Sequence, residues 1–298
     1  MADKFLYPQT KKYDVHENRS LANGSVITFN VPSYGTVDDI ILRFTNSGVA
    51  ATSANVISSI GKIAVNINGE QIINCTVERL YDFYKMLGNE VYQPAAMTGV
   101  ISLNLGRLLF KLPSNEDFFA WGCMNIDTIQ VQVYCNTLSN VTDCELSTIR
   151  RSVDSNMGSY IKLISYPQAM AAAGISTVDN LPRDSNEGYL CIMANAGTGG
   201  VISQGECVVN GTNIFQPQAQ DVNDYVVNNY GLAAVSGYFN YCFADGAIKG
   251  VLPMMGVTEL RLKTTFTTAP TTGVYDLLAC SIRNIPQSMM NAINVAAE

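Results

Sequence analysis

Histidine is almost absent from this chain, since His16 is the single one among 298 residues. A Ser-His-Asp or Cys-His catalytic site would have to use that residue. A metal-dependent enzyme of the cupin type needs several histidines, and the chain cannot supply them. We interpret His16 as a solvated residue of the polar N-terminal segment. The shortage of histidine therefore argues against these enzyme classes.

Charged residues are also scarce. They make up 14% of the chain, and its 18 Lys and Arg residues never form a run longer than two. Proteins that grip nucleic acid through its phosphates usually present a basic face, whereas this chain has a net charge of −7. Direct binding of nucleic acid is therefore not expected. Hydrophobic residues, at 47%, are sufficient for a large core.

Long apolar runs are missing as well. No stretch approaches the roughly 20 apolar residues that span a bilayer, and residues 1–20 have no apolar central region of the kind found in secretory signals. We therefore expect synthesis and assembly in the cytoplasm. The eight cysteines include no C-x-x-C pair, and we interpret them as reduced, buried thiols.

Signatures of catalysis and cofactor binding are absent. The glycine-rich AGTGG at residues 196–200 lacks the Lys-Ser/Thr of a phosphate-binding loop. The carboxylate pairs at residues 38–39 and 116–117 lie at predicted strand or loop edges. No spaced D-x-D-x-D pattern occurs, although loop carboxylates leave a structural calcium ion open. We therefore predict a protein that is not an enzyme and has no cofactor.

What the chain does contain is repeated alternation of apolar and polar residues. Such period-two patterns mark half-buried strands, and here Gly-, Pro-, Asn- and Ser-rich turns separate them. Many short strands of this kind favour a sandwich or barrel over βαβ units. The predicted strands are 26–31, 39–44, 62–67, 100–105, 128–134, 160–165, 189–194, 206–210, 238–244, 258–266 and 274–282.

Two segments have helical spacing instead. In LYDFYKMLG (residues 80–88) the residues Leu80, Phe83, Tyr84 and Leu87 fall at i, i+3, i+4 and i+7. Thr76 can cap the start of this helix, Glu78 suits its positive end, and Gly88 can end it.

The second helix is predicted from VNDYVVNNYG, residues 222–231. Its apolar residues Val222, Tyr225 and Val226 are expected to pack on an adjoining sheet or roll, and Gly231 is expected to end the helix.

Both helices follow a predicted strand that ends in Asn-Gly, so the sequence predicts two copies of one structural unit. Asp82 lies as far along the chain from Gly69 as Asp224 lies from Gly211. The separation between the two copies, from Gly69 to Gly211, is close to the size of an ordinary domain. We place their boundary in the polar segment 152–159.

The two ends of the chain leave two readings open. The N-terminal end is either a disordered tail or an arm that packs on a neighbouring subunit or touches an anionic membrane. The C-terminal residues 285–298 are either a short helix after Pro286 or a second arm. The N-terminal residues proposed for lattice or membrane contact are Lys4, Phe5, Tyr7, Lys11 and Lys12.

From about residue 25 to residue 285 the order of elements resembles that of double jelly-roll major capsid proteins of tailless icosahedral viruses with an internal membrane, in particular the corticovirus type of bacteriophage. In that family, too, a strand ending in Asp-Gly or Asn-Gly runs into a helix closing on Tyr-Gly, as in NGTNIFQPQAQDVNDYVVNNYG (210–231). Leu-Pro-Arg at 181–183 and ELRLK at 259–263 add to the resemblance.

The resemblance implies an all-β fold of two consecutive eight-stranded jelly rolls, each with a flanking helix. The implied parts are an arm (1–22), a first roll (23–153), a second roll (154–285) and a tail (286–298). It also implies a homotrimer of pseudo-hexagonal outline that tiles an icosahedral shell in the virion. Its implied partners are copies of itself, penton and minor capsid proteins, and an internal viral membrane reached through the termini.

Two other functions remain as alternatives. The first is a tandem β-sandwich that binds carbohydrate, as a lectin or adhesin does, although a secretory signal is not recognised. The second is a jelly-roll enzyme, which the single histidine disfavours.

Overall fold

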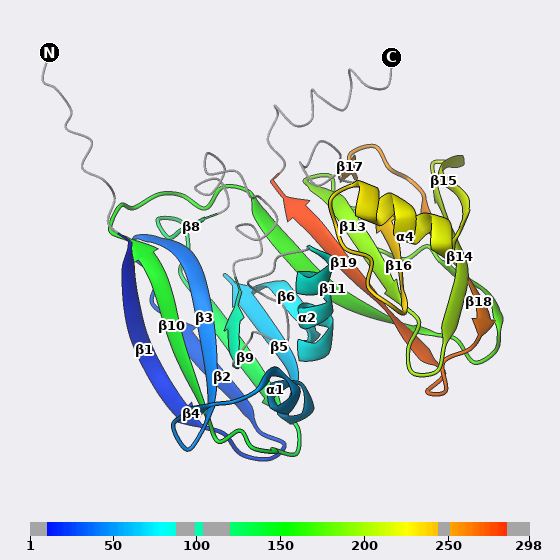
Figure 1. Ribbon diagram of the computed structural model, residues 1–298. Helices are drawn as coiled ribbons and strands as arrows, with labels where there is room; N and C mark the ends of the chain where they lie inside the picture. The colour runs from blue at the N-terminus through cyan, green and yellow to red at the C-terminus, as the bar shows by residue number, and fades with distance from the viewer. Residues whose placement is uncertain (1–10, 88–98, 104–119, 244–250, 285–298) are drawn as a thin grey trace, which may run out of the picture. The chain divides into compact units, whose positions relative to one another are not determined.

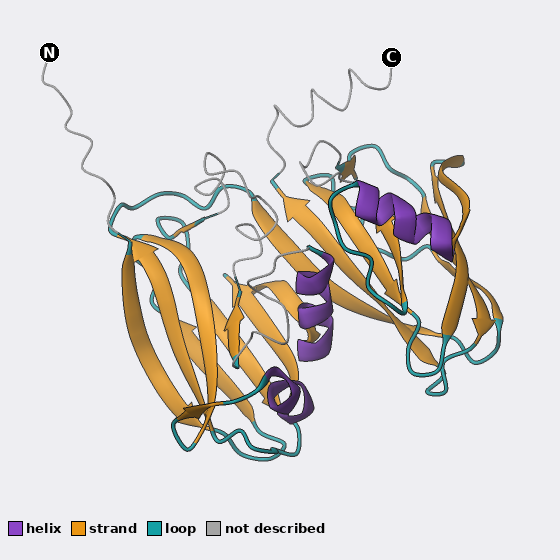
Figure 2. Cartoon of the chain, viewed as in Figure 1, coloured by secondary structure: helices purple, strands orange, loops and turns teal. Residues whose placement is uncertain are grey.

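The structure is a computed structural model that describes residues 11–87, 99–103, 120–243 and 251–284. Its contacts divide the chain into two compact units (Figure 1). Unit 1 holds the described residues up to Gln71, then 99–103, then 120–160. Unit 2 holds Ile72 to Leu87 and the described residues from Ile161 onward. Each unit is built mainly of strands (Figure 2).

The first sheet of unit 1 has the order β1-β10-β3-β4, and the short strands β7 and β8 also pair with β3. Its strand pairs are antiparallel. The bounds are β1 Lys12–Ser20, β3 Thr36–Asn46, β4 Val49–Ala50, β7 Val100–Ser102, β8 Trp121–Gly122 and β10 Asp143–Arg151.

The second sheet of unit 1 has the order β5-β9-β2 (Ile60–Ile67, Ile129–Cys135 and Val26–Val31). The predicted alternation is confirmed here, because Ile63, Val65 and Ile67 are buried, as are Ile129, Val131 and Val133. In the first sheet Ile40, Leu42 and Phe44 are buried in the same way. The two sheets therefore close an apolar core with these faces.

Unit 2 repeats this plan. One sheet has the order β16-β13-β19-β11-β6, with β17 paired to β13, and the other has the order β12-β18-β14-β15. The bounds are β6 Glu70–Thr76, β11 Tyr160–Ala169, β12 Gly174–Val178, β13 Glu187–Asn195, β14 Val201–Val209, β15 Thr212–Ala219, β16 Tyr238–Cys242, β17 Leu252–Pro253, β18 Leu260–Thr268 and β19 Val274–Arg283.

The core of unit 2 is rich in aromatic residues. Phe239, Tyr241, Phe266 and Tyr275 are all nearly inaccessible and belong to one buried cluster. Strand β13 differs from the half-buried strand predicted for residues 189–194, because all nine of its residues are buried. Both faces of this strand are therefore covered.

The strand order of one unit matches that of the other. In unit 1 the strands run β1-β10-β3-β7 in one sheet and β2-β9-β5 in the other, and β6 follows β5 in the chain. In unit 2 the corresponding orders are β11-β19-β13-β16 and β12-β18-β14-β15. Two antiparallel sheets whose strands are connected in this order form a jelly roll.

Both predicted helices are present. Helix α2 spans Val77–Met86 and helix α4 spans Gln220–Asn229. Gly231 follows the end of α4 as predicted, with a left-handed backbone of φ 75°, whereas Gly88 lies outside the described residues. A short helix that the sequence did not predict, α1 (Ser53–Ser59), precedes β5. None of the described helices is long and apolar enough to cross a membrane.

The edges of the predicted domains differ from the compact units. Residues 12–20, predicted as part of an arm, form strand β1 and pair with β10. Residues 72–87, predicted in the first roll, group with unit 2. The contact boundary near Tyr160 lies a few residues beyond the boundary predicted at 153/154. The roll limits themselves stay a prediction.

Gly205 tests the packing of the unit 2 core. A Cβ atom at this position in β14 would lie 2.2 Å from the ring of Phe239, which is fully buried. We expect Gly205→Ala to lower the free energy of unfolding by about 1–3 kcal/mol through overpacking. Gln216→Ala, at an exposed position of β15, is the control and should change it little. Urea denaturation measures both, and an unchanged midpoint for Gly205→Ala would contradict this packing.

Candidate functional site

Helix α2 begins where β6 ends, at a residue that satisfies a free backbone group of the helix. The Thr76 hydroxyl accepts a hydrogen bond from the backbone N–H of Arg79 at 3.3 Å, which confirms the predicted cap. Glu78 lies in the first turn, where a carboxylate complements the positive end of the helix. The cap fixes the direction in which the following side chains leave the helix.

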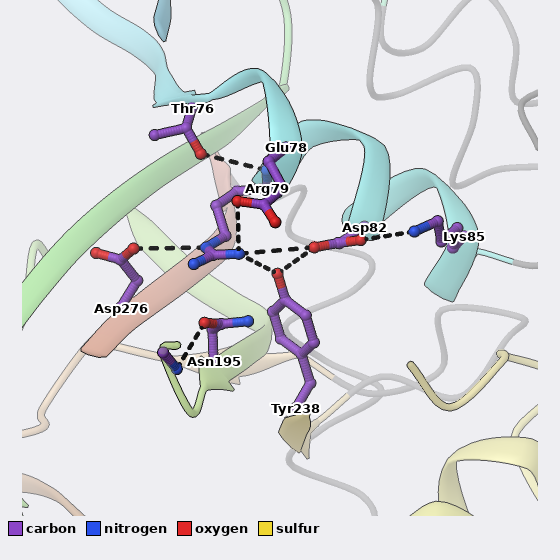
Figure 3. A network of polar contacts seen from close by, with 9 residues as sticks. Thr76, Glu78, Arg79, Asp82, Lys85, Asn195, Tyr238 and Asp276 are labelled. Atoms are coloured by element: carbon purple, nitrogen blue, oxygen red, sulfur yellow. Dashed lines mark hydrogen bonds and ion pairs between the residues drawn. The ribbon is translucent and has the colours of Figure 1, made fainter. Parts of the chain in front are cut away.

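The Arg79 side chain extends from α2 to two strands of unit 2 (Figure 3). Its Nε donates to Asp276 Oδ2 of β19 at 3.4 Å, and its Nη1 donates to the Tyr238 hydroxyl of β16 at 3.1 Å. The same Nη1 lies 3.7 Å from Asp82 Oδ2 and 3.4 Å from Glu78 Oε2. The guanidinium is thus matched by three carboxylates.

Tyr238 and Asp82 complete the network. The Tyr238 hydroxyl donates to Asp82 Oδ2 at 2.5 Å, and Lys85 Nζ lies 2.9 Å from Asp82 Oδ1. Burial raises the pKa of Tyr238 well above its ordinary value, so that the hydroxyl keeps its proton and remains a donor. Burial by itself would lower the pKa of Arg79, but the facing Tyr238, Glu78 and Asp276 raise it.

A cavity of about 410 Å³ borders this network. Among its lining residues, Arg79 and Lys85 are paired with Glu78 and Asp82, so these charges compensate one another. Within the described ranges, no three His, Cys, Asp or Glu residues gather as a metal site would require. The arrangement holds α2 on β16 and β19. The lining residues are Glu78, Arg79, Asp82, Lys85, Asn195, Ala233, Ala234, Val235, Ser236 and Tyr238.

Helix α4 meets its own sheet through a polar residue. Asn223 donates from Nδ2 to the Asn240 carbonyl at 2.8 Å and accepts from the Asn240 N–H at 2.9 Å. Asn240 lies in β16, the edge strand of its sheet, whose backbone groups need partners when they are buried. Asn223 and Val227 are the buried residues of this helix.

The prediction that Val222, Tyr225 and Val226 form the buried face of α4 is therefore wrong within this chain. Val222 is 47% exposed, Tyr225 is 71% exposed and Val226 is half-buried. The prediction assumed that apolar spacing marks the inward face, whereas the backbone groups of the edge strand turn Asn223 inward. In α2 the predicted residues Leu80, Phe83, Tyr84 and Leu87 are all buried.

The predicted contact arm is described only in part. Lys4, Phe5 and Tyr7 lie outside the described residues, whereas Lys11 and Lys12 are exposed at the start of β1. Further along this edge strand, Tyr13 is 56% exposed and Val15 is 55% exposed. Strand β1 thus carries exposed apolar residues as well as basic ones.

His16 also lies in β1, not in a solvated tail. It is half-buried, and its Nε2 lies 2.7 Å from Thr148 Oγ1 of β10. The strand pairing shifts register beside it, between Val15 and Glu17. Partial burial and then the nearby Arg150 lower the pKa of His16, while Asp14 opposes them. Protonation of this ring would therefore weaken the β1–β10 pairing.

All eight cysteines are buried, as the sequence indicated. Burial raises the pKa of Cys144 and Cys242, which suppresses their reactivity. For Cys191 the hydrogen bond with Cys280 raises the pKa first, followed by burial. None of these thiols is placed for nucleophilic chemistry.

Sequence reasoning missed the network around Arg79. Arg79 and Asp82 are spaced i, i+3 on a helix, which is a common surface pattern. Their partners Tyr238 and Asp276 lie far along the chain in the second half of the sequence, so no local signal connects them.

Comparison with known proteins gives matches along most of the chain. Residues 15–146 match the family described as viral coat protein P2 N-terminal domain, and residues 160–276 match the viral coat protein P2 C-terminal domain. A search of curated proteins finds no match.

Solved structures share the fold. The major capsid protein P2 of bacteriophage PM2 superposes with a TM-score of 0.77 at 16% identity, covering 93% of this chain and 99% of its own. The atomic structure of Sulfolobus Turreted Icosahedral Virus gives 0.65 at 12% identity (95% and 96%), and the PBCV-1 virus capsid gives 0.63 at 9% (93% and 95%). The predicted double jelly roll is thereby confirmed.

Replacement of Arg79 tests the network. Arg79→Met leaves Asp276 without this cation, so we expect the free energy of unfolding to fall by about 2–3 kcal/mol. Arg261→Met is the control, because its ion pair with Glu259 has side chains 41% and 31% exposed and is worth about 0–1 kcal/mol. Chemical denaturation compares the two, and equal losses would show that the Arg79 network adds nothing beyond a surface pair.

The lowered pKa of His16 leads us to expect that the stability of unit 1 depends on pH. Because the folded pKa of His16 is lowered, its stabilising contribution is present above the unfolded value of about 6.5 and is lost as pH falls through the folded value. Between about pH 7.5 and about pH 5.5, the wild type should lose more stability than His16→Gln, which stays neutral. Thermal denaturation and hydrogen exchange of the β1 amides measure this. Identical pH profiles for the two proteins would rule the effect out.

Proposed function

Because the chain belongs to the viral coat protein P2 family, we propose that it forms homotrimers that tile the icosahedral shell of a virus around an internal membrane. Membership makes it a major capsid protein and a component of the virion, with a structural and not an enzymatic role. The trimer, its lattice and the membrane are the parts that we propose.

The repeated strand order is the observation that supports a trimer. Each chain carries two units with matching sheets, β1-β10-β3-β7 with β2-β9-β5, and β11-β19-β13-β16 with β12-β18-β14-β15. Three copies around a threefold axis then present six similar rolls. A capsomer with six similar rolls has a pseudo-hexagonal outline, and hexagonal outlines tile a surface without gaps.

The surface of the described units also suits self-association. Apolar side chains that are more than half exposed occur on both units, among them Tyr13, Val49, Tyr225 and Met255. Obligate interfaces are large and hydrophobic, and burial of apolar area contributes about 25 cal/mol per Å² toward offsetting the cost of association. A charged fraction of only 14% is compatible with such contacts.

The remaining partners follow from the same proposal. We propose a first roll at residues 23–153 and a second at 154–285, with contacts to penton and minor capsid proteins at the margins of the lattice. The N-terminal residues Lys4, Phe5, Tyr7, Lys11 and Lys12 combine basic and aromatic groups, which suits contact with an anionic membrane surface. Assembly takes place in the host cytoplasm. Family membership decides against the carbohydrate-binding alternative.

Sizing of the purified protein tests the trimer. We expect a stable particle of three times the chain mass of 32.3 kDa by light scattering. Because apolar burial is insensitive to screening, the trimer should persist in about 1 M salt. A monodisperse monomer that stays monomeric as its concentration is raised would refute the trimer.

A further inference from the structure

Helices α2 and α4 occupy corresponding places in the repeat, and they match in length and in the positions of their caps. Each has ten residues. The N-caps are Thr76 (φ −68°, ψ 154°) and Ala219 (φ −68°, ψ 155°), and the C-caps are Leu87 and Tyr230. The interval from Thr76 to Ala219 equals the interval from Leu87 to Tyr230.

This interval between caps is longer by one position than the interval from Gly69 to Gly211. The extra position lies in the strand before the helix, because β15 has 8 residues where β6 has 7. A shift by one position rotates the faces of a helix by about 100°. Matching the caps therefore gives the correct correspondence between the faces of the two helices.

In this correspondence one face is buried in both helices. Leu80 matches Asn223, and Tyr84 matches Val227, since each pair is separated by the same interval as the caps. All four side chains are 1% exposed or less. These residues mark the inward face of each helix.

The second face is where the helices differ. Arg79 matches Val222 and Asp82 matches Tyr225. In α2 this face is held by Tyr238 and Asp276 of unit 2, as Figure 3 shows, and its side chains are only 13% and 11% exposed. In α4 the same face is apolar and open, with Val222 47% and Tyr225 71% exposed. A contact surface used in one copy of the repeat is thus left open in the other.

The strands that receive α2 have counterparts in unit 1. Asn240 and Leu278 alternate with Tyr238 and Asp276 onto the same outer face of β16 and β19, and both are fully buried. Met193 lies between them in register and is fully buried too.

In unit 1 the matching strands are β7, β3 and β10, where Arg43 stands in register with Val100 and Glu145. Here Arg43 has a side chain 43% exposed and Glu145 one 20% exposed, and Val100 is half-buried. At this register position the outer face of β7-β3-β10 is therefore less covered than its counterpart in unit 2, whereas Ser102 and Ser147 on the same face are buried.

We infer that the open face of α4, formed by Val222, Tyr225 and Val226, docks on the outer face of β7-β3-β10 of a second copy of this chain. This interface rests on the proposed trimer and names the two surfaces that form the contact between its subunits. The two surfaces are different, so the contact is heterologous, and a heterologous contact that closes generates a ring instead of a twofold dimer. Tyr225 is the anchor, because exposed aromatic rings dominate interface energetics and stack well on an arginine such as Arg43.

A charge placed on α4 tests the interface. We expect Tyr225→Glu to weaken trimer formation by more than about 30-fold, as loss of a central aromatic residue does. Its exposure of 71% means that the fold itself should survive, which circular dichroism checks. Ile175→Glu is the matched control, since Ile175 is 65% exposed in β12 of the same unit and lies outside the interface. Sedimentation velocity over a dilution series measures the assembly of all three proteins.

The outcomes separate this interface from the trimer itself. A trimeric wild type, a trimeric Ile175→Glu and a dissociated Tyr225→Glu support the inference. If Tyr225→Glu stays as trimeric as the wild type, or Ile175→Glu dissociates as readily, the interface is refuted while the proposed function stands. A monomeric wild type overturns the proposed function and the interface together.

Cross-linking tests the partner surface. The native cysteines are buried, so a short bismaleimide reports on introduced thiols. A chain with both Tyr225→Cys and Arg43→Cys should yield covalent trimers, and a mixture of the two single variants should yield cross-linked pairs. Either single variant alone should yield none, because the contact is heterologous. Cross-linking of Tyr225→Cys to itself, or none in the double variant, would overturn the assignment.

Discussion

The burial of strand β13 on both faces is the constraint on which unit 2 depends. A strand in a two-layer sandwich ordinarily keeps one face in water, yet every residue of β13 from Glu187 to Asn195 is buried. One face lies in the aromatic core with Phe239 and Tyr241. The other shares its side of the sheet with Tyr238 and Asp276, where α2 is anchored. Because a buried charge without a partner is costly, the anchor is a matched set in which Arg79 faces three carboxylates.

The free edge of the same sheet fixes the second helix. Strand β16 ends the sheet, so the backbone of Asn240 finds its partners in the side chain of Asn223. An asparagine amide supplies both a donor and an acceptor, which no apolar side chain does. That contact decides the rotation of α4 about its axis and turns Val222 and Tyr225 outward. The helix therefore buries Asn223 beside Val227 and leaves apolar side chains exposed that an ordinary surface helix would bury.

These two features show where sequence reasoning succeeds and where it stops. Strands with regular alternation, such as those containing Phe29, Leu42 and Val131, can be predicted because the apolar and polar residues next to each other in sequence indicate which face is buried. Strand β10 was missed because it buries Ser147, Thr148 and Arg150, which no hydrophobic pattern marks. The Thr76 cap of α2 and the end of α4 at Gly231 depend on local residues and were therefore predictable. The partners of Arg79 and the inward turn of Asn223 depend on residues distant in sequence, so only the fold reveals them.

The two helices carry different side chains on corresponding faces because a contact within one chain and a contact between chains have different free-energy costs. The partners of α2 belong to its own chain, so its contact forms without the loss of translational freedom that separate molecules suffer. A polar network such as that of Arg79, whose desolvation cancels much of its Coulomb gain, is sufficient there. If α4 joins separate chains, its face must supply a net driving force large enough to overcome that loss, and apolar burial by Val222 and Tyr225 supplies it. Duplication within one chain then allows one copy of the face to become charged and specific while the other stays apolar.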